Sequence, residues 1–323
     1  MNIKLSKVSF FLFVFFYNYI WIRMFIFPFM YDNYQNMGFW YIGIIMLISL
    51  VLFLIPKGNY NYNNSYFKYI YNTILIVESI LGIVLTTYFL EGFVNELNFI
   101  SVIIGICLVI IVISNMKTSS IIDMSTLFFI VSLLLIIFSF IYFIPLDVSF
   151  LFPIKAFDIG VVLVGIFLVL DNLSFMLIDR KDFKVTGFNI FLPVVCSILL
   201  FGFEYFMVLG SSGDVLFKGI DNLGFLVMLI KPVAKYVGNF DFVYIVCLIL
   251  IIVFKLGFNM SIVKNSFDNN IIKKCVNYML ILGCLLIEFF IGRESFGGVI
   301  YWINMLKFIL VIWVIKNVWK IKR

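Results

Sequence analysis

The sequence predicts an all-α membrane protein that crosses the bilayer ten times. Hydrophobic residues make up 64% of the 323 residues, and charged residues make up only 12%. A soluble domain has about 25% charged residues, so a water-soluble fold of this length would leave too much apolar surface uncovered. Long apolar stretches recur along the chain, and the basic residues between them fall on alternate sides. These three observations together define the class of the protein.

The apolar stretches have the length that a transmembrane helix requires. A hydrocarbon core about 30 Å thick needs roughly 20 apolar residues at a rise of about 1.5 Å per residue. Within lipid each backbone amide and carbonyl must find its partner inside the same segment, so the stretches are expected to be helices. We expect spans near residues 8–30, 38–55, 68–90, 98–115, 122–145, 157–178, 187–209, 241–263, 272–291 and 297–317.

The basic residues predict the orientation of these spans. With both termini in the cytoplasm, the inner segments carry fifteen lysines and arginines and the outer segments carry five, as the positive-inside rule requires. The inner set is Lys4, Lys7, Lys57, Lys68, Lys117, Arg180, Lys181, Lys184, Lys264, Lys273, Lys274, Lys316, Lys320, Lys322 and Arg323. The outer set is Lys155, Lys218, Lys231, Lys235 and Arg293. The net charge of +6 is therefore assigned to cytoplasmic loops and not to nucleic-acid binding.

Residues 215–237 form an ambiguous stretch. The apolar core of this stretch, residues 223–230, is too short to cross a bilayer, and Pro232 interrupts it. An eleventh span here would place Lys264, Lys273 and Lys274 outside and reverse the charge bias. We interpret residues 210–240 as an outer loop with short helices lying at the membrane interface.

A break between Pro145 and Asp158 divides the ten spans into five and five. We expect one integral membrane domain over residues 1–323, with a first repeat at about 8–145 and a second at about 157–317. Because each half has an odd number of helices, the second half enters the membrane from the opposite side. This arrangement predicts the five-plus-five inverted repeat of LeuT-like transporters.

Several ionisable residues fall within the predicted spans. A charge at bilayer depth is costly unless it is paired or hydrated, so each is a candidate functional residue. Matching depths suggest pairing Arg23 with Glu204 or Glu288, Glu78 with Lys307, and Asp171 with Lys255. Such pairs either lock helices together or line a site for a solute.

In a five-plus-five fold, helices 1, 3, 6 and 8 would line the central site. Glycines in helix 6 favour either an unwound, ligand-facing segment or close helix packing. The candidate ligand-binding residues are Asn18, Tyr19, Arg23, Glu78, Gly160, Gly165, Asp171, Asn172 and Lys255. The chain has no histidine, and its five cysteines lack metal-ligand spacing, so no metal, cofactor or catalytic residue is predicted.

The run VLGSSGDVLFKGIDNLGFLVMLIKPVAKYVGNFDFVYIVCLILIIVFK, residues 208–255, resembles the B-subunit family of spore germinant receptors. That family has a glycine ending helix 7, a short outer loop, an amphipathic segment and an aspartate opening helix 8. Its helix 8 usually runs to a Phe-Lys pair, here Phe254-Lys255. The stretch 147–184, with Pro153 and a basic end, is similar to the helix 6 region of the family. In helix 1 this chain has residues 21–23, Trp-Ile-Arg, where the family usually carries a glycine-containing break.

The resemblance implies the fold of amino acid–polyamine–organocation transporters. It implies a subunit that senses a small nutrient, often an amino acid, in the inner membrane of a dormant spore, together with a membrane A subunit and a C lipoprotein. The alternative is a secondary transporter of amino acids or related solutes, coupled to protons through Glu78 or Asp171. A membrane acyl- or glycosyl-transferase is disfavoured, because the chain has neither histidine nor an acidic cluster at a membrane face.

Overall fold

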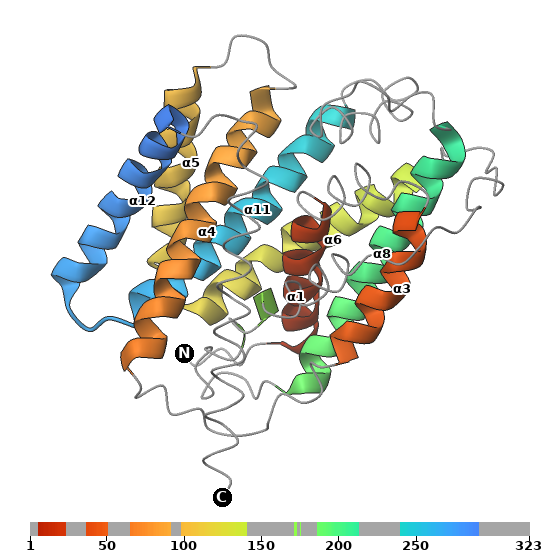
Figure 1. Ribbon diagram of the computed structural model, residues 1–323, viewed down its shortest axis with the longest axis horizontal. Helices are drawn as coiled ribbons and strands as arrows, with labels where there is room; N and C mark the ends of the chain where they lie inside the picture. The colour runs from red at the N-terminus through yellow and green to blue at the C-terminus, as the bar shows by residue number, and fades with distance from the viewer. Residues whose placement is uncertain are drawn as a thin grey trace, which may run out of the picture. The chain divides into compact units, whose positions relative to one another are not determined.

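The computed structural model describes residues 6–23, 37–50, 65–91, 98–140, 171–172, 175, 186–212 and 240–290. Within these residues the chain folds into eight α-helices (Figure 1). They are α1 (Lys7–Trp21), α3 (Met37–Ser49), α4 (Ser65–Glu91), α5 (Phe99–Ser114), α6 (Thr118–Phe140), α8 (Gly187–Ser212), α11 (Phe240–Asn265) and α12 (Asn270–Phe290). The predicted all-α class is confirmed for this part of the chain.

Five of these helices are long and apolar enough to cross a membrane. The spans lie at Tyr69–Tyr88, Thr118–Ile137, Gly187–Phe206, Ile245–Asn265 and Asn270–Ile287. The apolar helices α1, α3 and α5 are shorter than a full span in their described parts. The protein is thus a multi-pass membrane protein.

Eight of the ten predicted spans coincide with a described helix. Nearly all of predicted span 157–178, and all of 297–317, lie outside the described residues. So does most of the predicted outer loop 210–240, because α8 ends at Ser212 and α11 begins at Phe240. The total of ten spans and the five-plus-five repeat remain predictions.

Contacts along the chain define two compact units. Unit 1 comprises Met1–Pro56, Ile122–Asn172 and Asp179–Ile252. Unit 2 comprises Lys57–Ile121, Leu173–Ile178 and Val253–Arg323. The boundaries cross α6 near its start and α11 near its middle, so both helices contribute to each unit. Neither unit coincides with one of the predicted repeats.

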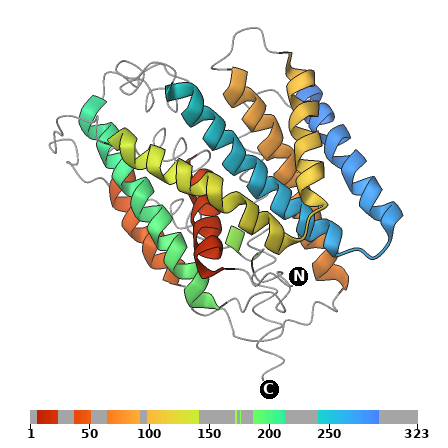
Figure 2. The ribbon, with the colours of Figure 1, turned by 180° about the vertical axis from the view of Figure 1, so that it is seen from behind.

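In unit 1, α8 packs against both α1 and α3, and Figures 1 and 2 show α3 and α8 running side by side. Gly202 allows the close approach of α3, because a Cβ built at this position would lie 3.2 Å from Cγ2 of Ile42. Phe129 of α6 packs on α1, with ring centroids 4.9 Å from Phe16 and 5.8 Å from Phe13. Aromatic packing therefore orients α1 within the unit.

In unit 2, α4, α5 and α12 pack against one another (Figure 2). The second half of α11 joins them through close glycine contacts. A Cβ at Gly257 would lie 2.5 Å from Cγ2 of Ile113 in α5, and one at Gly82 would lie 2.9 Å from Cδ2 of Leu256. Small residues let membrane helices approach closely, and dispersion between them then favours association.

Lys264 is buried at the end of α11. The sequence predicts it in an inner segment just beyond span 241–263, and the structure places it in the last turn of the helix. Nζ donates hydrogen bonds to Oγ of Ser114 at 2.6 Å and to Oδ1 of Asn115 at 2.8 Å. These partners lie at the carboxyl end of α5, where the helix dipole favours a cation. A long lysine side chain thus reaches polar groups from inside an apolar helix.

Candidate functional site

Helix α1 carries its polar side chains at its carboxyl end. The helix begins after Ser6, whose hydroxyl accepts a hydrogen bond from the backbone amide of Ser9 at 3.0 Å. Asn18 and Tyr19 lie in the last turn, and Arg23 follows on a π-helical turn. All three side chains are buried. Since Tyr19 and Arg23 are four residues apart, they project from the same face of the chain.

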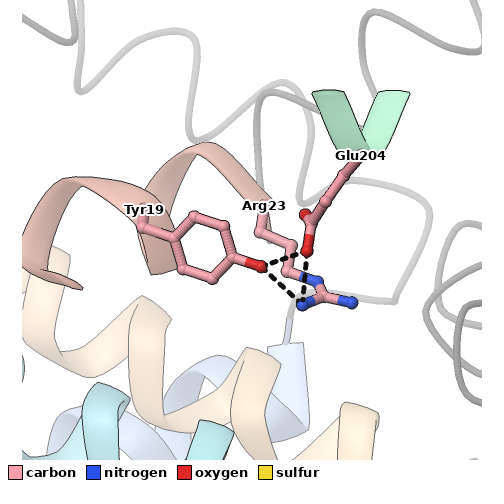
Figure 3. Close-up of polar contacts among 3 residues, drawn as sticks. All are labelled: Tyr19, Arg23 and Glu204. Carbon is pink, nitrogen blue, oxygen red and sulfur yellow. Dashed lines mark hydrogen bonds and ion pairs between the residues drawn. The ribbon is translucent and has the colours of Figure 1, made fainter. Parts of the chain in front are cut away.

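Tyr19 and Arg23 converge on Glu204 of α8, as Figure 3 shows. Nη1 of Arg23 lies 3.4 Å from Oε1 of Glu204 and donates a hydrogen bond to the Tyr19 hydroxyl at 2.8 Å. The Tyr19 hydroxyl donates to the same carboxylate oxygen, Oε1. The guanidinium carbon also lies 5.8 Å from the centroid of the Tyr19 ring, within range of a cation–π interaction. We call these three residues the charged cluster.

The charged cluster is electrically neutral, but the two carboxylate oxygens of Glu204 differ in their hydrogen bonding. The ion pair is not the bidentate arrangement in which a guanidinium grips both carboxylate oxygens, because a single oxygen, Oε1, receives the contacts from Arg23 and Tyr19. The other oxygen, Oε2 of Glu204, is buried and accepts no hydrogen bond from the described part of the chain. A carboxylate has about four acceptor positions, so part of its capacity is unused.

Asn18 forms a second polar contact in unit 1. Nδ2 of Asn18 donates to Oδ1 of Asn172 at 2.9 Å, and Nδ2 of Asn172 donates back to Oδ1 of Asn18 at 2.8 Å. Asn18 also donates to the backbone oxygen of Val14 at 2.7 Å. Both asparagines are fully buried. We call the two side chains the amide pair; it ties the end of α1 to the short helical segment at residues 171–172.

Four of the nine predicted ligand residues belong to the charged cluster or the amide pair: Asn18, Tyr19, Arg23 and Asn172. Asp171 is buried beside Asn172 in unit 1. Glu78 of α4 and Lys255 of α11 are buried in unit 2. Gly160 and Gly165 lie outside the described residues. None of these positions tests ligand binding itself.

The pairing of Arg23 with Glu204 is confirmed by the 3.4 Å contact. The predicted pair Glu78–Lys307 includes a residue outside the described range, and the pair Asp171–Lys255 stays a prediction. Glu204 was predicted as a partner of Arg23 but not as a ligand residue. Because Glu204 and Arg23 were predicted at matching depths in the membrane, Glu204 could have been added to the candidate ligand-binding residues.

Among the residues that the structure describes, no group of three or more histidine, cysteine, aspartate or glutamate side chains could hold a metal ion. No protein-family model matches the sequence, and none of the curated proteins compared with it is similar.

Proposed function

We propose that this protein is the membrane subunit of a spore nutrient-germinant receptor and binds a small solute, such as an amino acid, inside unit 1. The observation that carries the proposal is that the polar residues at the end of α1 are buried and partnered: Asn18 pairs with Asn172, and Tyr19 and Arg23 contact Glu204. Polar and ionisable groups at membrane depth are costly, and where they occur they commonly mark pathways or sites for solutes.

The composition of this site suits a small polar solute. The charged cluster supplies a guanidinium, a phenol and a carboxylate, and the amide pair supplies donors and acceptors. Asn18 and Tyr19 are neighbours in sequence, so one helix end presents both groups. The π-helical turn at Arg23 adds support, because such turns occur frequently at functional sites.

Two helix contacts in unit 2 support the five-plus-five repeat that the proposal assumes. In predicted span order, α1, α3 and α8 are helices 1, 2 and 7, while α4, α5, α11 and α12 are helices 3, 4, 8 and 9. An inverted repeat relates each helix to the fifth one after it, so helix 3 corresponds to helix 8 and helix 4 corresponds to helix 9. A contact between helices 3 and 9 therefore requires the equivalent contact between helices 8 and 4. Unit 2 has both, α4 with α12 and α5 with α11, the latter through Gly257 and Ile113.

A sensor and a transporter would use this site differently. A sensor binds the solute and shifts the population toward another helix arrangement that partner subunits detect. In the proposal those partners are the A subunit and the C lipoprotein, in the spore inner membrane. The second candidate is a proton-coupled transporter of amino acids or related solutes. It is favoured by the burial of two carboxylates, Glu78 and Asp171, that could carry a proton.

Two measurements test the proposal. Deletion of the gene should abolish germination of spores by at least one nutrient in a broad panel, and the native gene should restore it. Germination that is unchanged across the panel would contradict the receptor role. Purified protein in proteoliposomes should bind a radiolabelled nutrient without accumulating it under an imposed proton gradient. Accumulation that a proton ionophore abolishes would instead identify the transporter.

A further inference from the structure

Glu204 has an acceptor that the described fold leaves unused. Tyr19 and Arg23 both act on Oε1, whereas Oε2 is buried without a hydrogen bond from the described residues. A buried acceptor without a partner costs free energy, and in a functional protein it calls for an explanation. Because the residue is only 2% exposed, bulk water does not reach this oxygen freely.

We infer that Oε2 of Glu204 accepts a hydrogen bond from the ammonium group of a bipolar solute whose anionic group binds the guanidinium of Arg23. This inference rests on the proposed function and adds the chemistry by which the solute is recognised. It assigns Glu204 as a ligand-contacting residue, which the sequence did not predict, and it restricts the solute to those that carry both charges.

The charges of the site favour a bipolar solute over a simple ion. The pair of Arg23 and Glu204 is neutral, so a solute with a single charge would add an uncompensated charge at membrane depth. Such a solute would also separate the pair while compensating only one of its members, and a buried charge that has lost its partner is strongly unfavourable. A bipolar solute compensates both members. Its anionic group replaces the Glu204 carboxylate at Arg23, and its ammonium group replaces the Arg23 guanidinium at Glu204.

The geometry of the ion pair makes this exchange feasible. The contact between Nη1 and Oε1 is 3.4 Å long and involves one oxygen, which is weaker than a bidentate contact. Both side chains are long and have several rotatable bonds, through which their charged ends can separate. The Tyr19 hydroxyl already contacts both groups, so it is positioned between them.

The first test compares chemically related probes on the native protein. Binding to purified protein in lipid nanodiscs is measured by isothermal titration for glycine, L-alanine, L-valine and L-leucine. Their N-acetyl derivatives lack the ammonium group, and methylamine, ethylamine, isobutylamine and isopentylamine lack the carboxylate. We expect at least one amino acid to bind. Both of its analogues should bind with an affinity about 10-fold or more lower, because each has lost a hydrogen bond to a charged group.

The second test changes the protein. Glu204→Gln keeps the size of the side chain and removes its charge, so the preference for the amino acid over its N-acetyl analogue should fall toward unity. The matched control is Asp268→Asn, a change at an exposed carboxylate in unit 2, which should leave the preference unchanged. If Glu204→Gln does not fold, the probe series on the native protein decides the question.

The outcomes separate this inference from the proposed function. Equal binding of an amino acid and its N-acetyl analogue would overturn the inference. So would an unchanged preference in a folded Glu204→Gln variant, or selective binding of an uncharged sugar or nucleoside; the proposed function would survive all three results. Failure of the native protein to bind any amino acid, sugar or nucleoside would overturn both.

Discussion

Arg23, which follows α1, and Glu204 of α8 form an ion pair in the interior of unit 1, although 181 residues separate them in the sequence. The structure places both charges where water is excluded and leaves one oxygen of the carboxylate without a hydrogen bond from the described residues. Such a contact is an inefficient way to hold two helices together, because desolvation offsets much of its attraction.

Charge reversal tests the ion pair directly. Arg23→Glu and Glu204→Arg should each destabilise the protein by about 3–5 kcal/mol, because each leaves like charges buried together. The double variant restores opposite charges and should recover most of this loss. The measurement is thermal unfolding in detergent, followed by size-exclusion chromatography. A double variant no more stable than the single variants would show that the two residues are not paired.

The amide pair should show strong coupling in a double-mutant cycle. Asn18→Leu should cost about 1–3 kcal/mol, because it leaves the amide of Asn172 buried without its partner. Replacing both asparagines by leucine removes the unsatisfied group and should cost less than the sum of the single changes. Additive losses in thermal unfolding would contradict the reciprocal hydrogen bonds.

The α5–α11 contact depends on Gly257. Gly257→Ala introduces a methyl group that would lie 2.5 Å from Cγ2 and 3.0 Å from Cβ of Ile113, so the two helices must move apart. We expect a loss of about 1–3 kcal/mol, as is usual for overpacking. The control is Gly105→Ala in α5, where the new methyl group meets nothing within 4 Å. Equal thermal stability of the two variants would contradict this packing.

Cys107 of α5 and Cys284 of α12 are both buried in unit 2, with 3.9 Å between their sulfur atoms. Oxidation by iodine in a variant lacking the other three cysteines should form an intramolecular disulfide, since a shift of about 2 Å brings the sulfurs to bonding distance. The measurement is the faster migration of the oxidised chain on a non-reducing gel. A second variant, with Cys107 replaced by alanine, should not show it. Cross-linking between separate molecules alone would contradict the contact.

Lys264 should stabilise the carboxyl end of α5. Lys264→Met removes the hydrogen bonds to Ser114 and Asn115 and should cost about 1.5–3 kcal/mol, the range for hydrogen bonds to charged groups. Lys274→Met, at an exposed position on α12, is the matched control and should change stability by less than about 0.5 kcal/mol. Equal effects in thermal unfolding would show that the buried contacts of Lys264 contribute little.

The sequence predicted the helices well because bilayer thickness dictates their length and backbone hydrogen bonding dictates their form. The sequence limited the possible partners of Arg23 to two glutamates, because the position of a residue in a span gives its depth in the membrane and paired charges must lie at similar depths. Choosing Glu204 over Glu288 required the packing of α1 on α8, which hydropathy does not encode. The amide pair was equally inaccessible, because it depends on the rotation of α1 about its own axis.

We propose that the polar groups at the end of α1 form a solute site. The most direct measurement is equilibrium binding of radiolabelled amino acids, sugars and nucleosides to the native protein and to Asn18→Leu, Tyr19→Phe and Lys274→Met in nanodiscs. We expect saturable binding of at least one solute, weakened about 10-fold or more by the first two substitutions and unchanged by Lys274→Met. Absence of binding to the native protein, or equal binding to all three variants, would contradict it.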